Sequence, residues 1–396
     1  MSLFYSYFFG VPGGTWMALS VAGYITYYLS KCVQRPVMAV NPDSKFAQFL
    51  TSHLSVLQEK YWPTPWCLEA RLQTVLGSLF RSQLPNIDYQ RELVDLPDGG
   101  VVALDWHRAS FKGAKKDDPH PIVLLVPGLT GSSQSDYIRS LIHVSEKIGA
   151  SCVVLNQRGR GGVKLKTPRT YCAANSEDLG FVIDHLHKTF PRARLMLTGV
   201  SLGGMIVGNY LQQQSSAAVD KVLAAMIISV PWNVFVGCAS LETPHLNLML
   251  NRHLADCLVD SVKMHEDVIN HENAPWNWKE VCKSRTIREF DASFVVKQFG
   301  FRDVEDYYTA ASLNDKLHRI QVPLLGLNAA DDPFIPFNGV PLEQVKQTSH
   351  VAIVMTSHGG HIGFMEGMLP FRQNYIDRVF AEYCRAALAN PELIQQ

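Results

Sequence analysis

The 396-residue sequence lacks an excess of charge of either sign, because 36 lysines and arginines balance 36 aspartates and glutamates. A chain with balanced charge has no general electrostatic attraction to DNA or RNA. The basic stretch at 158–166 has only nine residues, and we interpret it as a loop rather than a nucleic-acid-binding patch. We therefore expect no nucleic-acid partner. Charged residues make up only 18% of the chain and hydrophobic residues 47%, which is typical of a globular protein and excludes a disordered one.

Signatures of metal, nucleotide and disulfide chemistry are also missing. The chain contains no HExxH, no CxxC pair and no phosphate-binding loop, so we predict no metal and no cofactor. Buried reduced thiols are favoured over disulfides for the eight scattered cysteines. No Asn-x-Ser/Thr sequon occurs, which agrees with a chain outside the secretory lumen. Nothing in the sequence indicates an obligate protein partner.

The N-terminus has no charged side chain from Ser2 to Ser30. A transmembrane helix needs about 20 mostly apolar residues. We predict a helix from about Gly14 to Leu29, which Phe4–Val11 extends or flanks in the membrane interface. An uncleaved anchor is favoured over a signal peptide or a buried helix. Two basic residues that follow, Lys31 and Arg35, favour a cytosolic position for the rest of the chain, although the opposite orientation stays open.

Three segments are expected along the chain. Residues 1–36 form a membrane anchor, residues 37–90 a helical extension, and residues 91–390 the main domain. Within the extension, Ser44 can cap a helix that continues to about Tyr61, and a second helical pattern runs over 64–80.

From residue 91 the pattern changes to that of an α/β protein. A hairpin is predicted over 91–107, with its turn at Asp98-Gly99-Gly100. Six short apolar runs then alternate with helical stretches, at 122–126, 152–155, 194–200, 224–230, 322–327 and 351–356. This alternation predicts a mostly parallel sheet of about eight strands with helices on both faces. The aromatic-rich segment at about 238–313 breaks the rhythm, and we interpret it as a helical cap rather than ordinary peripheral helices.

The strongest chemical signal is Gly199-Val200-Ser201-Leu202-Gly203, between a strand pattern and a helix pattern. A sharp strand-to-helix turn exposes the hydroxyl of the central serine, and the glycines permit that turn. A serine hydroxyl needs an adjacent base to act as a nucleophile. We therefore expect a histidine and an acid later in the chain.

Residues for both roles follow the last two predicted strands. The acid could be Asp331 or Asp332, and Asp332 is preferred because it lies directly before Pro333. The base could be His358 or His361, and His361, between Gly360 and Ile362-Gly363, is preferred. The predicted triad is therefore Ser201, Asp332 and His361, in the order serine, acid, histidine.

An oxyanion hole requires two backbone N–H groups near the serine. One is expected from Leu202, at the start of the helix after Ser201. The second is expected from the glycine-rich turn after 122–126, where Leu129 is preferred and Thr130 is the alternative.

Five motifs together resemble the α/β-hydrolase-domain family 4 over about residues 40–385: LLVPGLTGSSQSDYI, LNQRGRGGVKLKTPRTYCAANSEDL, TGVSLGGM, NAADDPFIP and SHGGHIGF. The resemblance implies an α/β-hydrolase fold, a single-pass anchor, and a catalytic triad at Ser201, Asp332 and His361. It also implies lipid or ester substrates, since relatives are linked to phospholipase activity on phosphatidylcholines and to medium-chain acyl esters.

These expectations describe a membrane-anchored serine hydrolase that cleaves carboxylic esters of lipids, with phospholipids as the favoured substrates. An endomembrane such as the endoplasmic reticulum is the expected location. Two alternatives stay open. The same acyl-enzyme could serve an acyltransferase or a thioesterase, and a membrane-tethered binding protein could carry an inactive triad.

Overall fold

The computed structural model describes residues 13–107, 120–371 and 373–395. In this part of the chain, nine strands form one sheet in the order β1-β9-β8-β7-β6-β4-β5-β3-β2. They are β1 (Val37–Ala39), β2 (Gln90–Asp95), β3 (Val101–His107), β4 (Ile122–Val126), β5 (Ser151–Asn156), β6 (Leu195–Val200), β7 (Ala224–Ile228), β8 (Leu324–Ala329) and β9 (Val351–Thr356). The strands from β4 to β9 run parallel, whereas β1, β2 and β3 are antiparallel to their neighbours.

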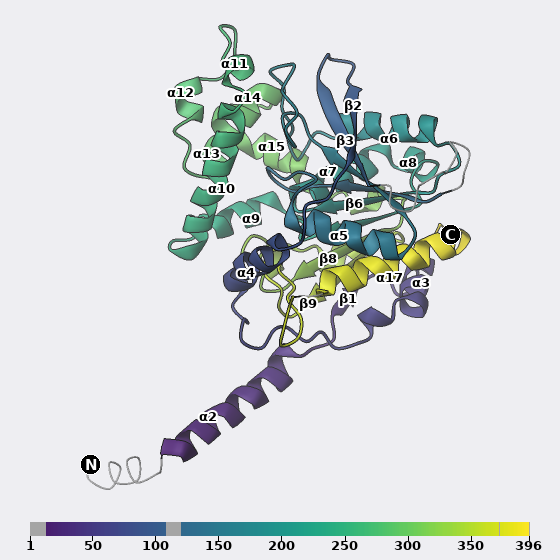
Figure 1. Ribbon diagram of the computed structural model, residues 1–396, viewed down its shortest axis with the longest axis vertical. Helices are drawn as coiled ribbons and strands as arrows, with labels where there is room; N and C mark the ends of the chain where they lie inside the picture. Colours follow the sequence, from purple (N-terminus) through teal and green to yellow (C-terminus); the bar gives the residue numbers. More distant parts are fainter. Residues whose placement is uncertain (1–12, 108–119, 372, 396) are drawn as a thin grey trace, which may run out of the picture.

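Helices cover both faces of this sheet (Figure 1). The main ones are α3 (Lys45–His53), α4 (Ala70–Ser82), α5 (Asp136–Lys147), α6 (Glu177–Thr189), α7 (Leu202–Gln214) and α17 (Tyr375–Ala389), with the short helices α8 (Ser216–Val219), α16 (Leu342–Val345) and α18 (Pro391–Ile394). In β4, Leu124 packs with the apolar side chains of α6 and α7, and Leu125 packs with those of α3, α5 and α17. Alternate residues of a strand point to opposite faces, so each buried strand contributes to two cores.

The predicted parallel sheet with helices on both faces is confirmed, including the hairpin and the six apolar runs. The structure adds a ninth strand, β1, which pairs with β9 at the sheet edge. The segment at 37–90, expected to be helical, therefore also contributes to the sheet. Its first helix begins after Ser44 as predicted, with the Ser44 hydroxyl accepting from the amide of Ala47, but it ends at His53 rather than near Tyr61. The chain turns there because Val56 and Leu57 enter the core.

The predicted N-terminal helix is present, with slightly different bounds. Helix α2 spans Gly13–Tyr27 and continues as a π-helical turn, Tyr28–Cys32. Within the described ranges, no helix is sufficiently long and apolar to cross a membrane. The expected extension at Phe4–Val11 lies outside the described residues.

A group of helices lies between β7 and β8, in the stretch where a cap was expected. They are α9 (Val234–Leu241), α10 (Leu246–Lys263), α11 (Glu266–Ile269), α12 (Trp278–Val281), α13 (Ile287–Phe290), α14 (Val296–Phe299) and α15 (Val304–Ala311). Figure 1 shows α10 to α14 as a lobe beside the sheet. The loops after the carboxyl ends of the parallel strands line the same cavity as α9 and α10. These loops and the two helices therefore lie next to each other.

Candidate active site

Ser201 lies on the turn that joins β6 to α7. Its backbone has φ 54° and ψ −121°, an unfavourable conformation for a residue with a side chain. The turn is crowded by backbone: a Cβ on Gly203 would overlap the carbonyl oxygens of Val126 and Pro127. Glycine at this position lets the first turn of α7 approach β4, and the strained turn leaves the Ser201 side chain partly exposed at the sheet edge.

A chain of hydrogen bonds joins Ser201 to His361 and Asp332. The Ser201 Oγ lies 3.0 Å from Nε2 of His361, and Nδ1 of His361 lies 2.9 Å from Oδ2 of Asp332. Asp332 is buried, and its second oxygen accepts the amide N–H of Phe334 at 2.8 Å. With its proton on Nδ1, the imidazole presents a lone pair at Nε2 to the serine hydroxyl. This arrangement can remove the serine proton as the hydroxyl attacks a carbonyl carbon.

The two alternative residues take other positions in the same loops. One carboxylate oxygen of Asp331 accepts the amide N–H of Gly360 at 2.9 Å, so Asp331 supports the loop that carries His361. Burial raises the pKa of Asp331 to about 7. His358 lies beside the Ser357 hydroxyl, and burial lowers its pKa. The structure therefore brings Asp332 and His361 to Ser201, and not Asp331 and His358.

Two backbone N–H groups beside Ser201 have no hydrogen-bond partner among the described residues, those of Leu129 and Leu202. The Leu129 turn approaches the serine closely, since a Cβ on Gly128 would lie 3.2 Å from Cβ of Ser201. The amide of the alternative donor, Thr130, is occupied because it donates to the Tyr171 hydroxyl at 3.1 Å. The two free amides match the preferred pair, and they can bind a developing oxyanion.

Ser201 and His361 line a cavity of about 270 Å³. Its other walls are mostly apolar side chains of the helices between β7 and β8, including Leu241, Leu254, Leu258, Val262, Phe290 and Val295. An apolar cavity next to the nucleophile can accept a hydrocarbon chain. In the described part of the chain, no group of histidine, cysteine and carboxylate residues could hold a metal, and all eight cysteines are free thiols.

Helix α4 contributes a contact that the sequence did not reveal. The hydroxyl of Thr74 accepts the amide N–H of His361 at 2.9 Å. A Cβ on Gly77 would lie 3.0 Å from Cα of Gly363, so α4 packs directly against the backbone of the histidine loop. The sequence of α4 showed only apolar periodicity, and no motif linked it to a loop almost 290 positions later.

The chain is similar to several known proteins over most of its length. A sequence model of the alpha/beta hydrolase fold family matches residues 121–368. Phospholipase ABHD3 of Mus musculus is 42% identical over 381 residues, which cover 96% of this chain and 91% of that protein. Monoacylglycerol lipase ABHD2 of Homo sapiens is 26% identical, covering 93% of this chain and 91% of that protein. The solved structure of Est1E from Butyrivibrio proteoclasticus with ferulic acid is 15% identical, with a TM-score of 0.47, covering 75% of this chain and 99% of Est1E.

Proposed function

The chain belongs to the alpha/beta hydrolase fold family, and we propose that it is a serine hydrolase that cleaves carboxylic esters of lipids, with phospholipids as its substrate class. The observation that carries this proposal is the hydrogen-bonded chain Ser201–His361–Asp332 at the wall of an apolar cavity. The 42% identity to a protein named phospholipase supports the substrate class.

The reaction proceeds through an acyl-enzyme. Ser201 Oγ attacks the ester carbonyl carbon while His361 Nε2 takes the hydroxyl proton, and Asp332 stabilises the imidazolium. The amides of Leu202 and Leu129 bind the oxyanion of the tetrahedral intermediate. His361 then gives its proton to the departing alkoxide, so that a lysolipid leaves as an alcohol. A water molecule, deprotonated by His361, attacks the acyl-enzyme and releases the fatty acid.

The helices between β7 and β8 act as a cap that binds the acyl chain. Their side chains supply most of the apolar wall of the cavity, and burying a hydrocarbon there stabilises the complex by about 25 cal/mol per Å² of apolar surface. The catalytic domain extends over 91–390, and the segment at 37–90 adds β1 and α4 to it. The motifs and the length look most like the mammalian α/β-hydrolase domain-containing protein 1, with protein 3 next. The relatives found include proteins named Phospholipase ABHD3 and not protein 1, so they favour the second of these over the first.

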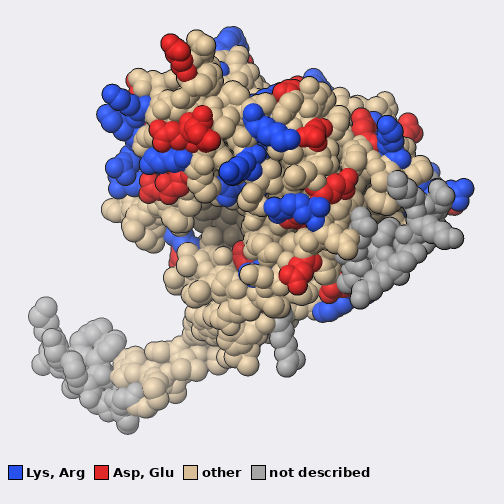
Figure 2. Space-filling model, turned by 45° about the horizontal axis from the view of Figure 1, so that its top comes forward, with Lys and Arg blue, Asp and Glu red and all other residues tan. Residues whose placement is uncertain are grey.

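The protein works at a membrane surface. The N-terminal segment is uncharged to Ser30, and the apolar side chains of α2 are exposed. Figure 2 shows few charged side chains on α2 and the surface beside it, while charges gather on the rest of this face. An endomembrane such as the endoplasmic reticulum, with the catalytic domain on the cytosolic side, belongs to the same proposal and rests on Lys31 and Arg35.

The test is hydrolysis of phosphatidylcholine vesicles by the full chain in membranes. We expect fatty acid and lysophosphatidylcholine from the wild type and none above background from Ser201→Ala. Ser52→Ala, on the exposed face of α3, is the matched control and keeps full activity. Adding an alcohol acceptor tests the alternative: an ester product in place of free acid would identify an acyltransferase. Equal hydrolysis by Ser201→Ala and the wild type would contradict the proposal.

A further inference from the structure

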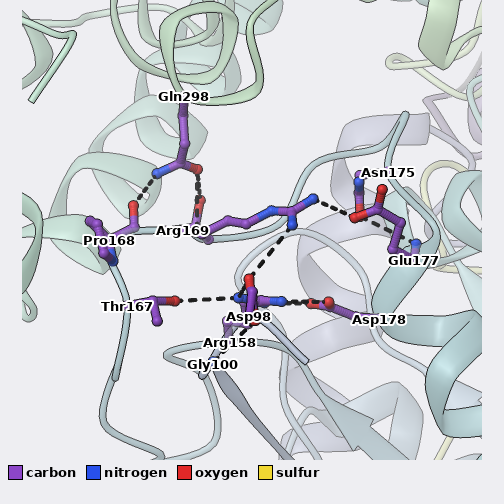
Figure 3. A network of polar contacts seen from close by, with 11 residues as sticks. Asp98, Gly100, Arg158, Thr167, Pro168, Arg169, Asn175, Glu177, Asp178 and Gln298 are labelled. Carbon is purple, nitrogen blue, oxygen red and sulfur yellow. Dashed lines mark hydrogen bonds and ion pairs between the residues drawn. The ribbon is translucent and has the colours of Figure 1, made fainter. Parts of the chain in front are cut away.

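Two arginines on the loop after β5 differ in their partners. Arg158 is 3% exposed, and its guanidinium bonds both oxygens of Asp178 at 2.7 Å and one oxygen of Asp98 at 2.7 Å. Figure 3 shows this guanidinium enclosed by Asp178, Asp98 and Thr167. Arg158 therefore has a structural role, because it joins the β2–β3 turn to the start of α6 with its charge fully compensated.

The same network continues to the cap. Arg169 pairs with Glu177 at 2.6 Å and lies 3.6 Å from Asp98. Gln298 in α14 donates to the carbonyl of Pro168 at 2.8 Å (Figure 3). The loop after β5 is therefore fixed to the sheet on one side and to the cap on the other.

Arg160, two residues after Arg158, has no carboxylate partner among the described residues. Its guanidinium bonds the carbonyl oxygen of Thr130, and its buried Nε has no hydrogen-bond partner there. Burying part of a guanidinium costs free energy when it has no counter-charge and one of its N–H groups has no acceptor. A ligand that supplies both would remove this cost.

The position of Arg160 places this charge between two spaces. It lines the apolar cavity that holds Ser201, and it also lines a neighbouring polar cleft with Lys164 and His265. Thr130, which it bonds, follows the proposed oxyanion donor Leu129. The guanidinium therefore lies in the wall that the apolar cavity of Ser201 shares with the polar cleft.

The remaining charges of the cleft leave an excess of positive charge. Arg91 and Asp105 form a two-point ion pair, both contacts at 2.7 Å, and compensate each other. The other charged residues of the cleft wall are one carboxylate, the exposed Asp88, and two cations, Arg160 and Lys164. The cleft is thus suited to an anion rather than to a cation.

The backbone holds Arg160 in place. Gly159, Gly161 and Gly162 have φ of 70°, 62° and 79°, and a Cβ on Gly161 would overlap the side chain of Asn156. Nε2 of His265 lies 2.9 Å from the carbonyl oxygen of Gly159, which fixes the loop to the turn between α10 and α11. A guanidinium on so constrained a loop loses little conformational freedom when it binds a ligand.

We propose that Arg160, with Lys164, binds the phosphate group of a phospholipid whose scissile acyl ester lies at Ser201. The inference rests on the proposed function and names the feature that selects its substrate. Arginine presents a planar set of donors that matches phosphate oxygens. In a glycerophospholipid, the phosphate and the two acyl esters are attached to the three carbons of one glycerol. The acyl chain enters the apolar cavity while the phosphate stays in the polar cleft.

The test compares two lipids with identical acyl chains, phosphatidylcholine and diacylglycerol, on the full chain and on Arg160→Gln. We expect kcat/KM for phosphatidylcholine to fall roughly 10- to 100-fold, the range of a lost hydrogen bond to a charged group. The rate on diacylglycerol, which has no phosphate, should fall no more than about 3-fold. Arg160→Lys should recover part of the loss, and Arg302→Gln, an exposed arginine of the cap, should change neither rate.

The same experiment separates the alternatives. An equal fall on both lipids would overturn the inference, because Arg160 would then act only through Thr130 and the oxyanion loop. Equal wild-type rates on both lipids would also overturn it, while the hydrolase function would stand. Inorganic phosphate serves as a second probe of the site. If it inhibits diacylglycerol hydrolysis by the wild type but not by Arg160→Gln, the result supports a phosphate site at Arg160. A wild type that hydrolyses neither lipid would remove the proposed function itself.

Discussion

At the scale of single residues, the candidate site could be predicted because backbone strain and sequence pattern coincide. Ser201 requires a positive φ, and the glycines around it are those that the turn needs for close approach. The choice of Asp332 and His361 over their neighbours also agrees with the geometry. The partners of Arg160 and Thr74 could not be predicted, since they depend on contacts between distant loops and helices that no local pattern encodes.

The two neighbouring aspartates allow a direct comparison. Asp332→Asn should lower kcat by about 10⁴, because an asparagine amide cannot hold the Nδ1–H tautomer of His361 as a carboxylate does. Asp331→Asn should lower kcat less than about 10-fold, because an amide oxygen can still accept from Gly360. Steady-state kinetics on a soluble ester measures both. A larger loss in Asp331→Asn would show that the roles of the two residues are reversed.

A buried carboxyl in the cap should make stability depend on pH. Burial raises the pKa of Asp291 to about 7, against an ordinary value of 3.8. Between pH 4 and 7 the unfolded chain therefore loses a proton that the folded chain keeps, so stability falls as pH rises through this window and stays low above it. Asp291→Asn should remove part of this fall. Melting temperatures at pH 5 and pH 8 measure it, and an unchanged difference between the two would contradict the assignment.

At the scale of elements, the buried parallel strands were predictable and the edge was not. Six apolar runs alternate with helices, and this rhythm defines β4 to β9. Strand β1 has only three residues, and Val37 and Met38 are not buried, so no alternation marks it. Helix α4 showed apolar periodicity, but its contact with the His361 loop follows from how the chain folds back over the sheet edge.

Helix α4 should therefore affect catalysis without touching substrate. Thr74→Val removes the acceptor for the amide of His361 and should lower kcat about 10-fold, because the imidazole is held less firmly towards Ser201. Thr51→Val, on the exposed side of α3, is the matched control. The rate of covalent labelling by a fluorophosphonate and the urea midpoint separate positioning from stability. Equal labelling rates in Thr74→Val and Thr51→Val would show that α4 does not position His361.

At the scale of the whole molecule, α2, α4 and the segments at 62–66 and 368–371 all expose large apolar side chains, and contacts join these segments into one surface. The ring centroids of Tyr28 and Trp62 lie 6.4 Å apart. Nε1 of Trp66 donates a hydrogen bond to the carbonyl oxygen of Met368 at 2.8 Å. The ring centroids of Phe80 and Phe371 lie 5.1 Å apart. Composition indicated an apolar N-terminus, but the sequence could not predict that residues 62–80 and 368–371 extend its surface. Helix α4 contributes to this surface and also contacts the loop of His361.

This surface should determine activity on vesicles. Leu369 is 72% and Phe371 58% exposed, so the double variant Leu369→Ser, Phe371→Ser should weaken binding to phosphatidylcholine vesicles by roughly 10-fold or more, from the apolar area lost. The rate on a dispersed short-chain ester should stay the same. Leu393→Ser, an exposed apolar residue in α18, is the control. Vesicle sedimentation measures binding, and unchanged sedimentation of the double variant would exclude this surface from membrane contact.

The central claim is that Ser201 is a nucleophile activated by His361 within this fold. The most direct measurement is mass spectrometry of peptides from the full chain after reaction with a fluorophosphonate. We predict one adduct per chain, on the peptide that contains Ser201, and its loss in both Ser201→Ala and His361→Ala. An adduct on another residue, or no adduct on a folded chain, would contradict the account.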